Sequence, residues 1–399
     1  MPDPGGSAVF LNGRLDGGAA VDLMVDKGRI IAFDRNAASP GMASIDLDGG
    51  LVLPGLIDGH AHLDKSLVGD VWIDNDSSAV IQDRIDHELR VESLARLPLA
   101  QRAANLVELA ITHGTTRIRT HVDVESRYGI GRVEAIAGVR ERYRDAIDIE
   151  IVAFPQLGVV SRPGTVALLD AALDAGADLL GGIDPAGVDH DVKGQLDVLF
   201  GLAAKRGVAL DFHLHDQGSL GLHQLERIAE RAAAQSMQGR VAISHAHCLG
   251  TVDPALLQPV IDKLAAGGVS IMTFGPGAVA MPPIKRLREA GVTVFSGNDN
   301  IRDPWTPFGN ADMLERAMIV AYRSGYRSDG DLRIAFDLAT VAAAKATGAA
   351  DYGLWPGAWA DFSVVAAASF PEAVVARPVR DCVVKRGKVV ARGGRLVGR

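Results

Sequence analysis

The chain has 399 residues, of which 48% are hydrophobic and 23% charged, and its 41 basic and 49 acidic residues give a net charge of −8. This composition is typical of a globular protein with one large domain and a small appendage. The sequence has no basic block, which argues against nucleic acid or an anionic membrane as a partner, and no apolar run long enough to span a bilayer.

The start of the chain and its cysteines indicate the compartment. Residues 1–6 lack the basic and apolar regions of a secretion signal. Only Cys248 and Cys382 occur, far apart in the sequence, so no disulfide framework is expected. We therefore expect a cytoplasmic protein; the sequence leaves open whether it forms a homo-oligomer.

Both ends of the chain carry short strand patterns punctuated by Gly and Asp, which are typical of antiparallel sheets. These segments are residues 8–11, 20–25, 28–33, 360–365 and 382–390. The simplest arrangement is one small β-sandwich domain built from residues 1–54 and 350–399. A larger domain, residues 55–349, is then inserted between its two halves.

The inserted region alternates apolar strand-like runs with longer helical patterns. The expected strands are 56–62, 116–123, 149–156, 179–184, 209–215, 241–247, 269–274 and 292–299. The expected helical regions are 81–113, 132–143, 166–175, 192–206, 220–235, 254–266, 282–290 and 310–323. Eight such units predict an α/β fold, a (β/α)8 TIM-like barrel. A doubly wound open sheet is less favoured, because no G-x-G-x-x-G motif follows the first strand.

Histidines gather at the carboxyl ends of the expected strands, where catalytic groups of such barrels lie. Of the 11 histidines, those at strand ends are His60, His62, His121, His213, His215, His245 and His247. His60 and His62, two apart on a strand, point the same way and can bind one metal ion. A shell of His60, His62, one fifth-strand histidine and Asp299 would suit a catalytic metal, and spacing alone leaves His245 as an alternative ligand.

Several motifs resemble one known family. They are Leu53–His62 (LPGLIDGHAH), His60–Lys65 (HAHLDK), Arg119–Asp123 (RTHVD), Val152–Gln156 (VAFPQ), Asp211–His213, Ser244–His245, and Asp299 followed by Asp303–Trp305. In order and content they resemble the amidohydrolase superfamily and, more closely, its cytosine deaminase-like members. The resemblance spans nearly the whole chain and implies a (β/α)8 barrel with a small flanking β domain.

The resemblance also implies roles for individual residues. His60, His62, His213 and Asp299 would hold one divalent metal ion, Zn or Fe. His245 would lie beside the reacting hydroxide, and Gln156 would hold the amide edge of a ring. We further expect Lys65, Trp305 and Asn300 on the substrate side. The fourth strand lacks the lysine that bridges two metals in dinuclear relatives, which favours a single metal ion.

The implied activity is that of a hydrolase acting on carbon–nitrogen bonds other than peptide bonds. Hydroxide formed at the metal would attack an sp² ring carbon of a small heterocyclic substrate and release ammonia, with Asp299 as general base. The alternative is an amidase or cyclic amide hydrolase, which would cleave a carbon–nitrogen amide bond with the same metal site.

Two positions depart from the deaminase pattern. Those enzymes have a Glu three residues after the fifth-strand histidine, where this chain has Asp216. Asp216 would serve as the acid, or His215 or His245 would replace it. Asn300 stands where cytosine deaminase has a second Asp, and an amide offers a donor as well as an acceptor. These departures argue against plain cytosine as the substrate.

Overall fold

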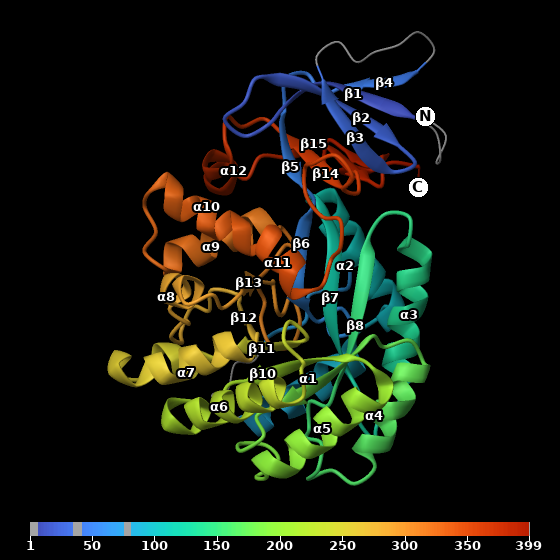
Figure 1. The fold of residues 1–399 in the computed structure, drawn as a ribbon. Helices are drawn as coiled ribbons and strands as arrows, with labels where there is room; N and C mark the ends of the chain where they lie inside the picture. Colours follow the sequence, from blue (N-terminus) through green and yellow to red (C-terminus); the bar gives the residue numbers. More distant parts are fainter. Residues whose placement is uncertain (1–6, 35–41, 76–80, 399) are drawn as a thin grey trace.

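The computed structural model describes residues 7–34, 42–75 and 81–398, and its two parts are a barrel and a sheet made from both ends of the chain (Figure 1). Residues 1–6, on which the expectation of an absent secretion signal depends, lie outside the described residues.

Eight parallel strands form the barrel. They are β6 (Leu56–Ala61), β7 (Thr115–Asp123), β8 (Asp148–Phe154), β9 (Leu179–Ile183), β10 (Ala209–Leu214), β11 (Val241–His245), β12 (Ser270–Thr273) and β13 (Val294–Ser296). The strands pair in sequence order from β6 to β13. A parallel bridge between Ala61 and Asp299 then brings the last strand back to the first. The predicted barrel is confirmed, and its last strand is shorter than expected because the chain leaves the ladder after Ser296.

Helices cover the outside of the barrel. They are α1 (Ile81–Leu94), α2 (Leu99–Thr112), α3 (Gly131–Tyr143), α4 (Thr165–Asp174), α5 (Val192–Arg206), α6 (Gly218–Ala234), α7 (Pro254–Ala266), α8 (Ile284–Glu289), α9 (Met313–Arg323), α10 (Asp329–Leu338) and α11 (Val341–Ala346). A 3-10 turn, η1 (His247–Gly250), follows β11. The expected helical region 81–113 is two helices, because Pro98 lacks an amide proton and starts a new helix as the N-cap of α2.

The terminal strands form a nine-stranded, mainly antiparallel sheet. They are β1 (Ala8–Arg14), β2 (Ala20–Asp26), β3 (Arg29–Asp34), β4 (Ala43–Asp46), β5 (Leu51–Pro54), β14 (Phe362–Val365), β15 (Arg380–Lys385), β16 (Lys388–Arg392) and β17 (Arg395–Leu396), and α12 (Phe370–Ala376) follows β14. β5 and β14 pair antiparallel, and Phe10 packs edge to face on Phe362 at 5.0 Å. The small β domain built from both termini is therefore confirmed, whereas its boundaries at 54/55 and 349/350 stay predictions.

The barrel packs apolar side chains outward against the helices and polar ones inward below the candidate site. Strands such as β8 and β9 are buried along most or all of their length, as parallel strands covered on both faces must be. Inside the barrel, Arg119 pairs with Asp211 at 3.0 Å and with Glu150 at 2.7 Å. These two ion pairs hold Asp211 in place, and Asp211 in turn accepts a hydrogen bond from Ser244 of the candidate site.

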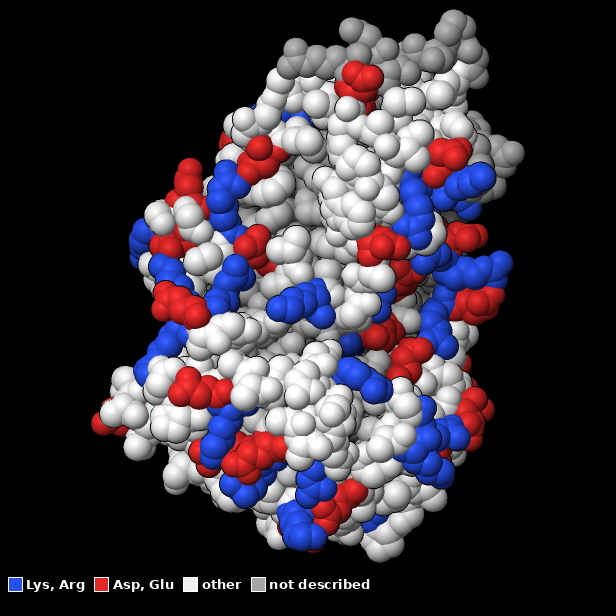
Figure 2. Space-filling model, viewed as in Figure 1, with Lys and Arg blue, Asp and Glu red and all other residues white. Residues whose placement is uncertain are grey.

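The surface charge is mixed, as the absence of a basic block in the sequence predicts. Acidic and basic side chains are interspersed over the face shown in Figure 2. No helix in the described ranges is long and apolar enough to cross a membrane.

The two domains are joined by buried ion pairs. Lys385 of β15 is 1% exposed, and its ammonium contacts Asp148 at the start of β8 at 2.7 Å and Asp361 at 2.6 Å. Removing this one cation takes a buried partner from both carboxylates and leaves them only Arg386 among the described residues, which costs more than losing an exposed pair.

We expect Lys385→Met to lower the free energy of unfolding by about 2–4 kcal/mol, because a buried pair is broken from one side. Lys193→Met is the control, since Lys193 is 83% exposed and pairs with Asp197 on the surface, and it should cost less than about 0.5 kcal/mol. Urea unfolding of both variants measures the difference. Equal midpoints would show that Lys385 does not join the domains.

Candidate active site

Four of the predicted metal ligands meet at the carboxyl ends of three strands. His60 and His62 come from β6 and the residue after it, His213 from β10, and Asp299 follows β13. The Nε2 atoms of His60 and His62 lie 3.4 and 3.3 Å from Oδ1 of Asp299, and Nε2 of His213 lies 3.4 Å from Nε2 of His62. Donor atoms of His60, His62 and His213 lie within 4.8 Å of one another, and so do donor atoms of His60, His245 and Asp299.

The charges of this cluster suit a divalent cation. Burial lowers the pKa of His62, and it lowers that of His213 well below its usual value, so both rings are neutral and can donate a lone pair. Burial raises the pKa of Asp299, but the neighbouring histidines His245, His60 and His62 outweigh it and hold that pKa well below its usual range. Nε2 of His60 is buried and has no hydrogen-bond partner among the described residues, and an orphaned atom of this kind fits a site that a cation completes.

The backbone is strained at the same strand ends. His245 and Asp299 have φ values of +75° and +63°, in the left-handed region that non-glycine residues rarely adopt. At Gly297 a Cβ atom would lie 2.4 Å from the backbone nitrogen of His60, so only glycine lets the chain after β13 approach β6 this closely. Strain of this kind is held in place where geometry matters for function.

Hydrogen bonds fix the orientation of His60. Its Nδ1 atom lies 2.8 Å from Oγ of Ser244, and that hydroxyl donates to Asp211 at 3.2 Å. A hydrogen bond to Nδ1 leaves Nε2 to face the cluster, as in many histidine metal ligands. His121 lies below, with its ring centroid 4.0 Å from that of His60.

His215 and Asp184 form a second polar pair beside the cluster. Nδ1 of His215 lies 2.7 Å from Oδ2 of Asp184, and its ring stacks on His245 at 4.5 Å. Loss of water around the ring lowers the pKa of His215, but the charge of Asp184 and the hydrogen bond to it outweigh this, and the pKa is raised. The pKa of His245 is held well below its usual value by burial and by His215. One histidine is thus poised to carry a proton beside one that stays neutral.

Asp216, the predicted acid, is engaged elsewhere. Its Oδ2 atom accepts from the backbone N–H of Gly187 at 2.8 Å and from Nε2 of Gln224 at 2.9 Å. Gln224 belongs to α6, so these bonds hold the carboxylate toward that helix and the loop after β9. Its catalytic role stays a prediction.

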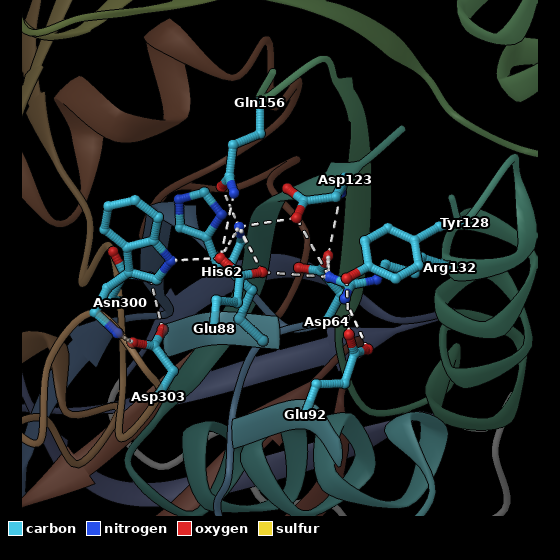
Figure 3. Close-up of polar contacts among 12 residues, drawn as sticks. His62, Asp64, Glu88, Glu92, Asp123, Tyr128, Arg132, Gln156, Asn300 and Asp303 are labelled. Carbon is cyan, nitrogen blue, oxygen red and sulfur yellow. Dashed lines mark hydrogen bonds and ion pairs between the residues drawn. The ribbon is translucent and has the colours of Figure 1, made fainter. Parts of the chain in front are cut away.

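Hydrogen bonds through Glu88 and Asp303 link the four predicted substrate-binding residues, Lys65, Gln156, Asn300 and Trp305, into one polar wall. Figure 3 shows Gln156, Asn300, Glu88 and Asp303 in this wall. Phe154 stacks on His213 at 4.0 Å, and Gln156, two residues later, lies beside His62 in Figure 3. The Nε1 atom of Trp305 donates to Glu88 at 2.7 Å, and Glu88 also contacts Lys65 and Gln156. Sequence reasoning missed Glu88, because an acidic residue in a polar helix such as α1 has no feature that separates it from solvent-facing ones.

Asn300 completes the wall on the side of β13. Its Nδ2 atom donates to Oδ2 of Asp303 at 2.6 Å, while Oδ1 of Asp303 accepts from the backbone N–H groups of Trp305 and Thr306. Because an ionised carboxylate can only accept hydrogen bonds, Asp303 binds the amide nitrogen of Asn300 and not its amide oxygen. Asp303 therefore occupies the amide nitrogen of Asn300, and the role of Asn300 toward a substrate stays a prediction.

Taken together, the barrel and its buried histidine–carboxylate cluster define a hydrolase whose site is able to hold a metal ion. The chain matches the model of the Amidohydrolase family over residues 43–391 and belongs to that family. The predicted superfamily is thus confirmed, and the protein is a hydrolase acting on carbon–nitrogen bonds other than peptide bonds.

Individual relatives match over almost the full chain. The N-isopropylammelide isopropyl amidohydrolase of Pseudomonas sp. (strain ADP) is 32% identical, with 93% of each chain covered. The crystal structure of N-isopropylammelide isopropylaminohydrolase from Burkholderia multivorans ATCC 17616 has a TM-score of 0.94 at 44% identity, over 98% of this chain and 100% of that one. The 5-methylcytosine deaminase from Klebsiella pneumoniae, liganded with phosphonocytosine, has a TM-score of 0.85 at 27% identity, over 96% and 98%.

We expect the purified protein to retain about one divalent ion per chain and His213→Ala to lose most of it, because a donor atom is removed from the cluster. Elemental analysis by mass spectrometry after gel filtration measures this. His223→Ala is the control, since His223 is exposed on α6, and it should keep its metal. If His213→Ala retains as much metal as the wild type, His213 is not a ligand.

Proposed function

We propose that this protein hydrolyses the bond between a ring carbon and an exocyclic nitrogen of a nitrogen heterocycle, releasing ammonia or a small amine. One observation carries the proposal: neutral imidazoles and an ionised carboxylate meet beside a wall of amide and indole side chains. The relatives named for N-isopropylammelide and 5-methylcytosine match almost the whole chain, which supports a ring as substrate.

One divalent cation, Zn or Fe, would be held by His60, His62, His213 and Asp299. When bound, such a cation lowers the pKa of water and so supplies hydroxide at neutral pH. Asp299 is ionised and lies beside both first-strand histidines, so its carboxylate can accept the proton of the attacking water. Neutral His245 has one N–H donor and one nitrogen acceptor, so it can hydrogen-bond a group beside the carbon under attack.

We assign the proton that the leaving nitrogen needs to His215 rather than to Asp216. The Asp184 carboxylate raises the pKa of His215, so the ring carries a proton over a wider pH range than a free histidine. The His215 side chain is 44% exposed, which lets it exchange protons with solvent. Asp216, by contrast, is bonded to Gly187 and Gln224.

The wall suits an uncharged planar ring. Trp305 offers an indole face, and Gln156 and Asn300 offer amide groups that match alternating N–H and C=O groups on a ring edge. Rings of the triazine or pyrimidine type carry such edges. The same wall would also receive a cyclic amide, in which case the bond cleaved lies within the ring and no ammonia is released.

A panel of pyrimidines, amino-triazines, N-alkylamino-triazines and pterins tests the activity. We expect at least one ring to release ammonia or alkylamine in a metal-dependent reaction, measured by a coupled assay for ammonia and by mass spectrometry of the product. Turnover of cyclic amides alone, with ring opening, would replace the deaminase assignment by the amide hydrolase.

The acid is tested by paired substitutions. We expect His215→Gln to lower kcat about 10²- to 10⁴-fold, the range for loss of a general acid. Asp216→Asn should have a much smaller effect. Both variants should keep their metal, because neither residue is a proposed ligand. A large loss in Asp216→Asn with little loss in His215→Gln would return the acid role to Asp216.

A further inference from the structure

Glu88 of α1 lies at the centre of the substrate wall. Its side chain is only 6% exposed, and its two oxygens lie 3.3 Å from Nζ of Lys65. Oε2 also accepts from Nε1 of Trp305 at 2.7 Å and from Nε2 of Gln156 at 3.2 Å. Three of the four residues expected to face the substrate therefore touch one carboxylate (Figure 3).

The charges around Glu88 determine which way Gln156 points. Lys65 can only donate, and it donates to Oε1 of Gln156, while Glu88 accepts from Nε2 of the same amide. A flipped amide would face nitrogen toward the ammonium and oxygen toward the carboxylate, which is repulsive at both ends. Each end of Gln156 keeps one further hydrogen-bonding position, so Glu88 decides where a ring meets a donor and where it meets an acceptor.

The ammonium of Lys65 is itself fully used within the protein. It has three protons, and its acceptors are Glu88, Gln156 and Asp123, the last at 2.9 Å. The Lys65 side chain is 1% exposed. Lys65 therefore holds the neighbours of the ring in place, and its direct contact with substrate stays a prediction.

Helix α1 approaches the wall with polar groups rather than with an apolar stripe. Arg84 donates to the backbone carbonyl of Trp305 at 3.2 Å, and Glu92 pairs with Arg132 at 2.7 Å. The polar face of α1 thus carries Glu88 into a site that is otherwise built from strand ends, and the hydrogen bonds of Glu88 are made to the wall itself.

We propose that Glu88 is a positioning residue that fixes the hydrogen-bonding direction of Gln156 and the orientation of Trp305, and so sets which ring edge the site accepts. The inference rests on the proposed function, because it takes this wall as the surface that binds the ring. Burial would raise the pKa of Glu88, but Lys65 and Arg132 lower it to about 2, so the carboxylate is an acceptor throughout the working range.

Glu88→Gln is the informative change because it keeps size and shape. One oxygen becomes an NH2 group, which cannot accept. In one orientation it meets the N–H groups of Trp305 and Gln156; in the other it meets the ammonium of Lys65. The first orientation removes the acceptor of Nε2 of Gln156, and the second repels the ammonium that donates to its Oε1, so each weakens the constraint on the direction of this amide.

Glu92→Gln is the matched control. Glu92 lies one turn further along α1, and its substitution removes the same charge and an ion pair with Arg132, but Glu92 makes no contact with Lys65, Gln156 or Trp305 among the described residues. We expect Glu88→Gln to raise KM about 10- to 100-fold, the size of a lost charge-assisted hydrogen bond. The fall in kcat should be smaller, because the metal cluster is untouched. Glu92→Gln should keep the wild-type KM, and Glu88→Asp should recover part of the loss.

Tryptophan fluorescence tests the inference without turnover. We expect Glu88→Gln to change the emission of Trp305, because its indole N–H loses a carboxylate acceptor, and Glu92→Gln to leave it unchanged. The difference should vanish when both are made in a Trp305→Phe background, which removes the signal of Trp305 and leaves that of the other three tryptophans. A wild type that turns over no ring would reject the proposed function, while the emission change would still hold.

Equal KM and equal emission in Glu88→Gln and Glu92→Gln would overturn the inference. The same holds if both variants lose only thermal stability, because Glu88 would then be one more structural charge on α1. If Glu88→Gln does not fold, Glu88→Asp is measured against Glu92→Asp with the same two readouts.

Discussion

The hydrogen bond from the backbone N–H of Asp299 to the carbonyl oxygen of His60, at 2.8 Å, closes the barrel and assembles the candidate metal centre at once. It is the contact by which the last strand returns to the first, and it sets the Asp299 carboxylate against the Nε2 atoms of His60 and His62. The close approach depends on Gly297, where any side chain would strike the backbone of His60. The same hydrogen bond therefore closes the barrel and sets the positions of His60, His62 and Asp299.

Buried charge surrounds this closure and is balanced group by group. Below the cluster, Arg119 neutralises Asp211, which in turn orients Ser244 and His60. To the side, burial raises the pKa of Asp123 to about 7 against the opposing charge of Lys65. Charges of this kind are costly to bury, and the ion pairs of Arg119 with Asp211 and of Lys65 with Asp123 indicate that they are kept for geometry rather than for stability.

Much of this arrangement could be predicted from the sequence. The alternation of apolar strands with helices sets the barrel, and the H-x-H spacing places His60 and His62 on one face of a strand because side chains alternate. The left-handed turns at His245 and Asp299 could not be predicted, since neither residue is glycine and no local pattern marks them. Nor could the bonds that hold Asp216 toward α6, because they depend on packing between segments distant in the sequence.

Glu88 is another residue whose position could not be predicted from the sequence. Its helix is polar along most of its length, and periodicity assigns a residue to the core only through apolar neighbours. Here the buried position is polar and its partners, Lys65, Gln156 and Trp305, come from three other segments of the chain. Such a residue is found only when the tertiary structure brings those segments together.

The pairing of β5 with β14 has a consequence for synthesis. Residue 51 lies opposite residue 365, and β5 runs through a single glycine into the strand that carries His60. While the ribosome makes the barrel, β5 has no partner on that side, and it gains one only after β14 has been made. Contacts so distant in sequence form late and slowly. A nascent or truncated chain that ends before β14 would therefore hold a barrel whose entry strand is not yet anchored, and activity would arrive once β14 is in place.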